Sequence, residues 1–241
     1  MPVLSIIIPT LKEGKFLDRT LKNLAGLSLT HEIIITDGGS TDETLSIARR
    51  YTDKIVVWDK PRRQTFGEAK NAGANLATGE FLVFIDADVL IPSPEAFFEE
   101  MLHVFKASPS LVAATTPLKP YLENTSLADA FFSVPLNYFY ILSNNVCRIG
   151  NSSGEFQMVR TKIFREVGGF EERLAAGEDN DLFRKLSAIG ETISYRTLCV
   201  RHSLRRSHKL GWIRTYGIWI KNGLSVAFRK KAAYKEWLIV R

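Results

Sequence analysis

The first ninety residues alternate short apolar runs with stretches of helical periodicity. The apolar runs are rich in β-branched and aromatic residues, as buried strands are; they span residues 3–9, 31–37, 54–59 and 81–88. Between them, apolar or small residues recur at helical spacing in residues 17–27, 44–51 and 66–77. This alternation predicts an α/β protein with a parallel, doubly wound sheet flanked by helices. Ser40 or Thr41 is expected to cap the helix over 44–51.

The second half has a different pattern. Residues 128–145 are strongly apolar and aromatic, but Pro135 and Asn137 interrupt them and the run is too short for a membrane span. We expect this run either to pack within the domain or to lie in a membrane interface. A helix is predicted over 181–186 after the acidic start GEDND, and a strand over 192–202.

Polar residues stand at the carboxyl ends of three predicted strands. They are Thr10 with Glu13 close by, Asp37, and Asp86 with Asp88. In open α/β sheets ligands bind outside the carboxyl ends of the strands, so these side chains are expected to share one crevice. No G-x-G-x-x-G follows the first strand and no P-loop motif is present, which argues against a dinucleotide site and a P-loop protein.

The sequence DAD at residues 86–88 places two carboxylates at the end of an apolar strand. Charged groups are costly to bury unpaired. Hard divalent cations such as Mg²⁺ or Mn²⁺ take carboxylate oxygens and bridge to substrate phosphates. The alternative is that one Asp caps the next helix and the other is exposed.

Charge is distributed unevenly along the chain. The net charge is +6, yet residues 196–241 hold twelve Lys or Arg and one acidic residue, which gives +11 there. Such a tail suits phosphates, an anionic lipid surface or nucleic acid, and the plainer alternative is a solvated basic helix. Two cysteines do not make a disulfide framework, and the first residues do not resemble a signal peptide. We therefore expect a cytoplasmic protein with peripheral contact on the inner face of a membrane.

Four segments in order resemble family 2 glycosyltransferases. They are IIIPTLKEGKFLDRTLKNL, ITDGGSTDET, AKNAGANLATGEFLVFIDADV and VGGF with GEDNDLFRKL, and the resemblance covers residues 3–205. It implies the GT-A fold, a Rossmann-like and mostly parallel sheet flanked by helices. It also implies transfer of a sugar from a nucleoside diphosphate to an acceptor, with inversion at the anomeric centre.

The resemblance also implies roles for residues on the donor side. The residues expected to bind the nucleotide are Pro9, Thr10, Glu13, Asp37, Lys70, Asp86, Ala87 and Asp88. Asp88 is expected to bind a divalent metal, Mn²⁺ or Mg²⁺, together with Asp86 and His202. Asn71 follows Lys70 as in the family's basic-Asn pair, whereas Lys12 stands where the family often has Asn.

On the acceptor side, Asp179 matches the catalytic base of the family and Glu178 is expected to orient it or the acceptor. Asp181 is read as a carboxylate at the start of the helix. The residues expected to shape the acceptor side or hold phosphate are Gly168, Gly169, Phe170, Arg205 and Arg206. In domain terms we expect a glycosyltransferase domain over 1–205, with a nucleotide half at 1–120 and an acceptor half at 121–205. A basic amphipathic helical segment is expected over 206–241.

The predicted function is metal-dependent transfer of a single sugar from a UDP- or GDP-sugar to a hydroxyl or lipid-phosphate acceptor. The Q-x-x-R-W pattern of processive relatives is missing from RRSHKLGW, which favours a single transfer. One alternative is a sugar-nucleotidyltransferase, although PTLKEGKFL is not a glycine-rich loop. Another is a non-catalytic protein that binds nucleotide sugars; binding of nucleic acid is the least favoured reading.

Overall fold

The computed structural model describes residues 2–229, 231–234 and 236. Within them, a seven-stranded sheet has the order β3-β2-β1-β4-β8-β6-β9. Its strands are β1 Leu4–Thr10, β2 His31–Asp37, β3 Ile55–Val57, β4 Phe81–Ile85, β6 Leu111–Thr115, β8 Phe156–Arg160 and β9 Glu191–Ser194. A second, three-stranded sheet has the order β5-β10-β7, from β5 Val89–Leu90, β10 Val200–His202 and β7 Leu118–Pro120.

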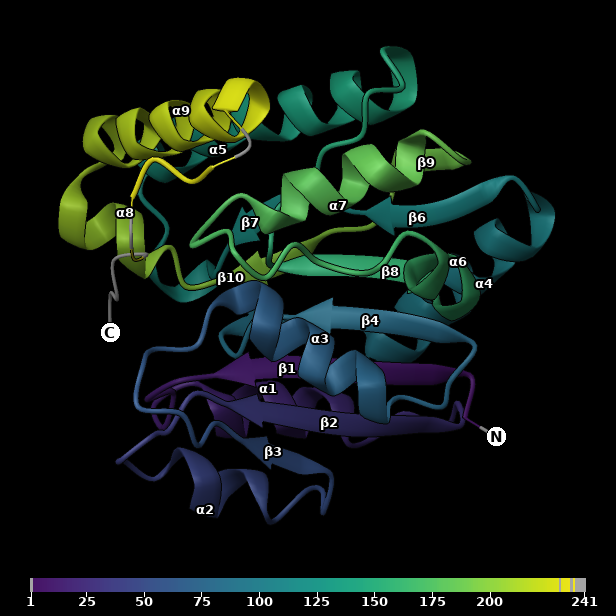
Figure 1. Ribbon diagram of the computed structural model, residues 1–241, viewed down its shortest axis with the longest axis vertical. Helices are drawn as coiled ribbons and strands as arrows, with labels where there is room; N and C mark the ends of the chain where they lie inside the picture. The colour runs from purple at the N-terminus through teal and green to yellow at the C-terminus, as the bar shows by residue number, and fades with distance from the viewer. Residues whose placement is uncertain (1, 230, 235, 237–241) are drawn as a thin grey trace.

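Helices cover both faces of the large sheet (Figure 1). One hydrophobic core joins the sheet to α1 Leu17–Leu24, α2 Thr44–Ala48 and α4 Pro94–Ala107. A second core joins the other face to α3 Phe66–Leu76, α6 Thr161–Glu166 and α7 Glu178–Ser187. Ile6 and Ile8 of β1 point into the first core and Ile7 into the second, so the strand is apolar throughout.

The remaining helices lie together at one end of the molecule (Figure 1). They are α5 Leu127–Ile141, continued as a π-helix over Leu142–Val146, α8 Arg205–Leu210 and α9 Trp212–Arg229; a 3₁₀ turn, Leu122–Asn124, precedes α5. Pro135 lies inside α5, where it loosens the turn, and the Tyr216 hydroxyl of α9 donates to the Phe132 carbonyl in that turn. None of the described helices is long and apolar enough to cross a membrane.

The predicted fold class is confirmed: the chain is α/β, with a mostly parallel sheet between helices. Strand β8 differs, since it runs antiparallel to both β4 and β6. Strands β6 and β8 were not recognised in the sequence. The proposed division at residue 205 stays a prediction, and residues 230, 235 and 237–241 of the expected basic segment lie outside the described residues.

Two local predictions were wrong. The strand expected over 192–202 is two strands in different sheets, because the chain leaves β9 at Ser194 and re-forms β10 at Val200 beside β7. The expected cap of α2 by Ser40 or Thr41 is also absent. Instead the Asp42 carboxylate accepts from the backbone N–H and hydroxyl of Thr44, the first residue of α2.

Candidate active site

The ends of β1 and β2 are joined by a fully buried carboxylate. Asp37 accepts hydrogen bonds from the Thr10 hydroxyl at 2.8 Å and from the backbone N–H groups of Gly39 and Ser40 at 3.0 and 2.6 Å. The Ser40 hydroxyl donates to it as well, at 2.6 Å. Asp37 therefore shapes the turn after β2, and its expected contact with the base stays a prediction.

The loop after β1 is held against the same turn. Lys12 donates its backbone N–H to the Ser40 hydroxyl at 2.7 Å, and Glu13 donates its own to the Thr44 hydroxyl at 2.8 Å. Lys12 has φ +57°, a left-handed conformation that Asn adopts more readily than Lys. The family often has Asn at this position, so Lys12 departs from the family pattern at a position with positive φ.

Arg205 connects Glu13, in the loop after β1, with Asp88, which precedes β5. Its Nη1 and Nη2 atoms donate to Glu13 at 2.6 and 2.8 Å, and its Nε lies 3.3 Å from Oδ2 of Asp88. The guanidinium also lies over the ring of Phe16, 5.1 Å from its centroid. Ser203 donates to the same Asp88 oxygen. The arginine expected to clamp phosphate thus sits between the carboxylates expected to bind nucleoside and metal.

Asp86 lies within a group of carboxylates. Burial, followed by the negative charge of Glu155, raises the pKa of Asp86 well above its usual value. Oε1 of Glu155 lies 3.6 Å from Nδ1 of His202. The sequence reading missed Glu155; its one signal is that it directly precedes the apolar run of β8.

The side chains of Asp86, Asp88 and His202 have atoms of the kind that bind a divalent cation, although they are not arranged as a complete metal site. Carboxylate oxygens and an imidazole are ligands for Mn²⁺, and the surplus of negative charge around Asp86 favours a cation. No three His, Cys, Asp or Glu side chains in the described part of the chain are arranged to hold a metal ion. The expected trio of Asp86, Asp88 and His202 is therefore not assembled as ligands here.

The second cluster surrounds Asp179 at the start of α7. Its Oδ1 accepts from Lys70 Nζ at 2.5 Å and from Gln157 Nε2 at 3.0 Å. Lys70 Nζ also lies 3.7 Å from Oε1 of Glu178. Burial by itself would lower the pKa of Lys70, but the two carboxylates outweigh burial and raise it. We expected Lys70 among the nucleotide-binding residues, whereas the structure places its ammonium on the predicted catalytic carboxylates.

Helix α3 fixes the position of Lys70. A capping box between Thr65 and Glu68 starts the helix. Gly73 lets the helix approach β1 closely, since a Cβ there would lie 2.4 Å from Ile7 Cγ2. Because glycine allows α3 to pack closely on β1, Lys70 lies in the interior, with 1% of its side chain exposed.

Glu178 and Asp181 differ although both lie in the first turn of α7. Burial and the neighbouring Asp179 raise the pKa of Glu178 to about 8, so its carboxyl is largely protonated at neutral pH. Asp181 pairs with Lys185 one turn later, at 3.0 Å, as a carboxylate at a helix start does. Asp179 pairs with Lys70 and has 16% of its side chain exposed, so among these three residues its position best suits a group that accepts a proton.

The VGGF turn packs against Lys70 of the Asp179 cluster. Gly168 and Gly169 have φ +78° and +66°, conformations that favour glycine. Phe170 is buried, exchanges two backbone hydrogen bonds of 3.0 Å with the Asn71 side chain, and lies under Lys70 Nζ at 5.0 Å. The Phe170 ring thus packs against the Lys70 ammonium. The expected acceptor role of the turn stays a prediction.

Three other predicted residues lie near the crevice with limited exposure. Ala87 packs its side chain into the core and its carbonyl accepts from Thr20. Pro9 is buried within β1, and Arg206 is half-buried on α8. The expected roles of Ala87, Pro9 and Arg206 stay predictions.

Comparison with known proteins decides the family. The model of glycosyl transferase family 2 matches residues 5–168, which is more than half of the chain. The chain belongs to glycosyltransferase family 2. The family assignment agrees with the order of the DAD and GED segments and with the sheet between helices.

Relatives of this family 2 glycosyltransferase act on different sugars. It is 27% identical to validoxylamine A glucosyltransferase of Streptomyces hygroscopicus subsp. jinggangensis, over 87% of this chain and 57% of that protein. It is 26% identical to the O-antigen chain rhamnosyltransferase WbaN of Salmonella anatum, over 86% of this chain and 67% of that protein. The chain spans little more than half the length of the glucosyltransferase.

Solved structures share the fold. The mannosyltransferase PcManGT of Pyrobaculum calidifontis, in complex with GDP-Man and Mn²⁺, superposes with a TM-score of 0.73 at 20% identity, over 95% of this chain and 64% of that one. TarS of S. aureus in complex with UDP-GlcNAc gives 0.62 at 20% identity, over 84% of this chain and 58% of that one. At such identities the likeness shows the fold alone.

Proposed function

We propose that this protein transfers a single sugar, with inversion, from a UDP- or GDP-sugar to an acceptor hydroxyl, and that a divalent metal assists. The observation that carries the proposal is the Asp179 carboxyl group, which accepts hydrogen bonds from Lys70 and Gln157 and interacts electrostatically with nearby Asp86 of the DAD segment. Inversion in a single displacement requires a base on the face of the sugar opposite the leaving group. Two separate acidic groups, one at the end of β4 and one at the start of α7, support such a mechanism.

The base side follows from the contacts of Asp179. Lys70 and Gln157 both donate to Oδ1, and we assign Oδ2 as the atom that accepts the proton of the acceptor hydroxyl. Gly154 keeps the space beside this oxygen open, because a Cβ there would lie 2.9 Å from Oδ2. The protonated Glu178 adds a neighbour without a second negative charge. A positioned base of this kind contributes about 10²–10⁴-fold to the rate.

The donor side follows from Asp88, Asp86 and His202. They would hold Mn²⁺ or Mg²⁺, which when bound stabilises the negative charge of the departing diphosphate. The structural neighbours PcManGT, with Mn²⁺, and the glucosyl-3-phosphoglycerate synthase of Mycobacterium tuberculosis, with Mg²⁺ and UDP, support this assignment. Arg205 would leave Glu13 and Asp88 and bind the diphosphate as a cation. A lipid-phosphate acceptor is the finer part of the proposal and is supported by the surface described below.

Calorimetric titration tests the donor site. Full-length protein is titrated with UDP and with GDP, each with and without Mn²⁺ and without lipid. Metal-dependent binding of one nucleotide is the expected result and names the donor class. A folded protein that binds neither nucleotide would overturn the proposal.

A substitution at the base separates an enzyme from a binding protein. Asp179→Asn should reduce turnover by about 10²–10⁴-fold and leave nucleotide affinity unchanged, because the amide cannot accept the proton. Asp181→Asn is the matched control, since it removes a carboxylate from the same helix turn. An equal loss of turnover in both variants would contradict the assignment.

A further inference from the structure

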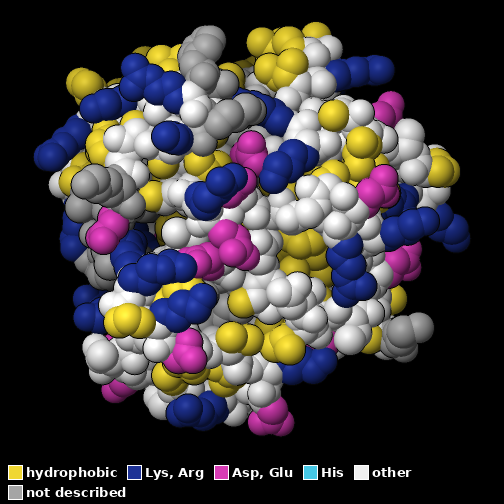
Figure 2. Space-filling view, in the orientation of Figure 1, with side chains coloured by type: hydrophobic (Ala, Val, Ile, Leu, Met, Phe, Trp, Pro, Cys, Tyr) yellow, Lys and Arg dark blue, Asp and Glu magenta, His cyan; other side chains and the backbone are white. Residues whose placement is uncertain are grey.

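Helix α5 presents an apolar stripe to solvent. Leu127, Phe131, Val134, Tyr138 and Leu142 recur at helical spacing and are between 50% and 93% exposed. An amphipathic helix normally turns such a stripe toward the core. Monomeric soluble proteins rarely leave an extended apolar patch uncovered. Hydrophobic side chains accordingly gather over α5 and its continuation at the top of Figure 2.

Helix α9 extends the same surface. Ile213, Ile220 and Leu224, exposed by 82%, 58% and 54%, fall on one face of the helix. The Trp212 ring stacks on Phe132 of α5 with centroids 5.3 Å apart. The two helices are therefore packed together, and both turn apolar residues outward.

The charge of this surface has one sign. From Ser126 to Val146 and from Arg205 to Arg229 the sequence has one acidic residue, Asp129. Asp129 is buried and accepts from Trp212 Nε1 at 2.8 Å and from its helix-capping partner Ser126. Arg214 and Lys221 are exposed on α9, one face away from its apolar stripe. An apolar stripe with a cationic border is thus complementary to an anionic, apolar partner.

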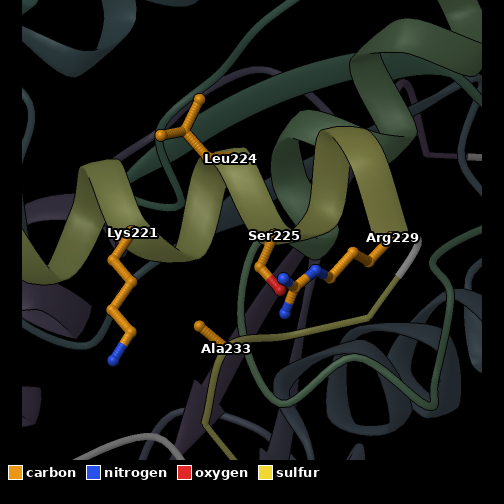
Figure 3. A pocket seen from close by; sticks show the side chains of 5 residues that line it. All are labelled: Lys221, Leu224, Ser225, Arg229 and Ala233. Atoms are coloured by element: carbon orange, nitrogen blue, oxygen red, sulfur yellow. The ribbon is translucent and has the colours of Figure 1, made fainter.

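A hollow of about 430 Å³ lies at the cationic border, beneath α9. It is lined by Lys221, Leu224, Ser225, Arg229 and Ala233. Figure 3 shows Leu224 projecting from one side of α9 while Lys221 and Ser225 project from the other. A phosphate headgroup beside the two cations would leave Leu224 to contact acyl chains, as in interfacial helices.

The apolar surface of α5 is connected to the predicted active site. Ser152, in the segment that follows α5 and its π-helix, donates its backbone N–H to the Asn180 side chain at 3.3 Å, so this segment borders the start of α7 beside Asp179. The π-helix that continues α5 is hydrogen-bonded to β9 and to the segment before β8, since buried Asn144 accepts from the Thr192 hydroxyl and donates to the Asn151 carbonyl. The outer face of α5 and the base side of the crevice therefore belong to one structural unit.

We propose that the outward faces of α5 and α9 form a docking surface for an anionic lipid bilayer and present the crevice to a lipid-linked acceptor. The acceptor part rests on the proposed function, whereas docking does not. A second copy of the chain would bury the apolar stripe but would leave the Arg214 and Lys221 border without an anionic partner. Nucleic acid would use the cations and leave the apolar stripe without a partner.

Vesicle sedimentation tests docking without nucleotide or metal. Full-length protein is mixed with phosphatidylcholine vesicles or with an equimolar mixture of phosphatidylcholine and phosphatidylglycerol. We expect binding to the anionic vesicles and much weaker binding to the neutral ones. Phe131→Ser with Tyr138→Ser should weaken binding about tenfold. The matched control, Leu76→Ser with Ile189→Ser, removes exposed apolar side chains elsewhere and should change nothing.

A second pair of variants separates the charges from the apolar stripe. Arg214→Gln with Lys221→Gln should weaken binding about fivefold for each cation removed. The control, Arg49→Gln with Lys106→Gln, makes the same charge change at the end of α2 and in the last turn of α4, and should have little effect. Docking is overturned if wild type binds neither vesicle, if controls and test variants weaken binding equally, or if only the charge variants do. It is also overturned by a dimer in sedimentation velocity that the Phe131 and Tyr138 substitutions dissociate.

Nucleotide calorimetry on the Phe131 and Tyr138 variant keeps the two proposals apart. Unchanged nucleotide affinity with lost vesicle binding supports docking by this surface. A variant that keeps full binding to anionic vesicles would overturn docking by this surface, whatever its nucleotide affinity. Wild-type protein that binds vesicles but no nucleotide retains docking while the proposed function fails.

Discussion

Two clusters at the predicted site each contain a cation between two acidic side chains, yet they differ in how deeply that cation is buried. On the base side, Lys70 lies between Asp179 and Glu178 on a capped helix, with 1% of its side chain exposed. On the donor side, Arg205 lies between Glu13 and Asp88, with 20% of its side chain exposed. It follows Leu204, whose φ of +52° is costly for a non-glycine residue.

This difference suggests different roles. The buried Lys70 ammonium lies on a core helix and, by donating to Asp179, fixes the orientation of the carboxyl group proposed as the base. An arginine on a short helix at the border of the crevice can exchange its carboxylate partners for a diphosphate and a metal. The first cluster is expected to be permanent and the second exchangeable, and four substitutions test that contrast.

The largest effect is expected for Lys70→Met. This change leaves the largely buried Asp179 carboxyl group without its cation, next to fully buried Glu178, and should lower the free energy of unfolding by about 3–5 kcal/mol. Turnover should fall as well, because the base loses its orientation. Lys22→Met is the control: its side chain is 68% exposed and pairs with Asp18 at the surface. Urea denaturation measures both variants, and equal stabilities would show that the Lys70 cluster does not hold the fold.

Glu178→Gln should change how stability depends on pH. The folded protein keeps Glu178 protonated up to about pH 8, whereas an unfolded glutamate ionises near pH 4.5. The unfolded state therefore releases this proton first, and wild-type stability falls as pH rises between these values. The variant lacks this loss, which amounts to about 1.4 kcal/mol for each unit of raised pKa.

Denaturation at pH 5 and pH 8 measures that effect. The stability of Glu178→Gln relative to wild type should be greater at pH 8 than at pH 5. Other titrating groups are common to both proteins, so they largely cancel in the comparison. Parallel curves for the two proteins would rule out a protonated Glu178.

Gly154→Ala should disturb the base without unfolding the protein. The added methyl group would lie 2.9 Å from Oδ2 of Asp179, so the carboxylate must shift. We expect kcat to fall about tenfold to a hundredfold, since misplaced catalytic groups are costly, while nucleotide affinity is retained. Gly26→Ala meets no atom within 4 Å and serves as the control. A normal kcat in Gly154→Ala would exclude Oδ2 as the proton acceptor.

The smallest effect is expected for Arg205→Gln. Removing the competing cation from Asp88 should increase Mn²⁺ affinity about fivefold in the absence of nucleotide, as expected for a partly exposed ion pair. Binding is followed by paramagnetic resonance of free Mn²⁺. Lys209→Gln makes the same charge change further along α8. If both variants gain affinity equally, net charge and not the Arg205 contact is the cause.

The local pattern of the sequence accounts for much of this molecule. The strands from Leu4, His31 and Phe81, the DAD carboxylates at a strand end and the acidic start of α7 were all predicted from periodicity and residue type. These features depend on neighbours along the chain, and four ordered segments were enough to suggest the family that the family model then confirmed.

Tertiary structure decided the pairings and the exposed faces. Lys70 meets Asp179 across 109 positions and Arg205 meets Glu13 across 192, and no local pattern specifies which charges meet over such separations. Periodicity identified the apolar residues of α5 but not what covers them, because burial depends on the elements packed around a helix. For the same reason Glu155 was missed. The sequence by itself determined the elements and their chemistry, and only packing decided which cation serves each carboxylate and which apolar face stays open.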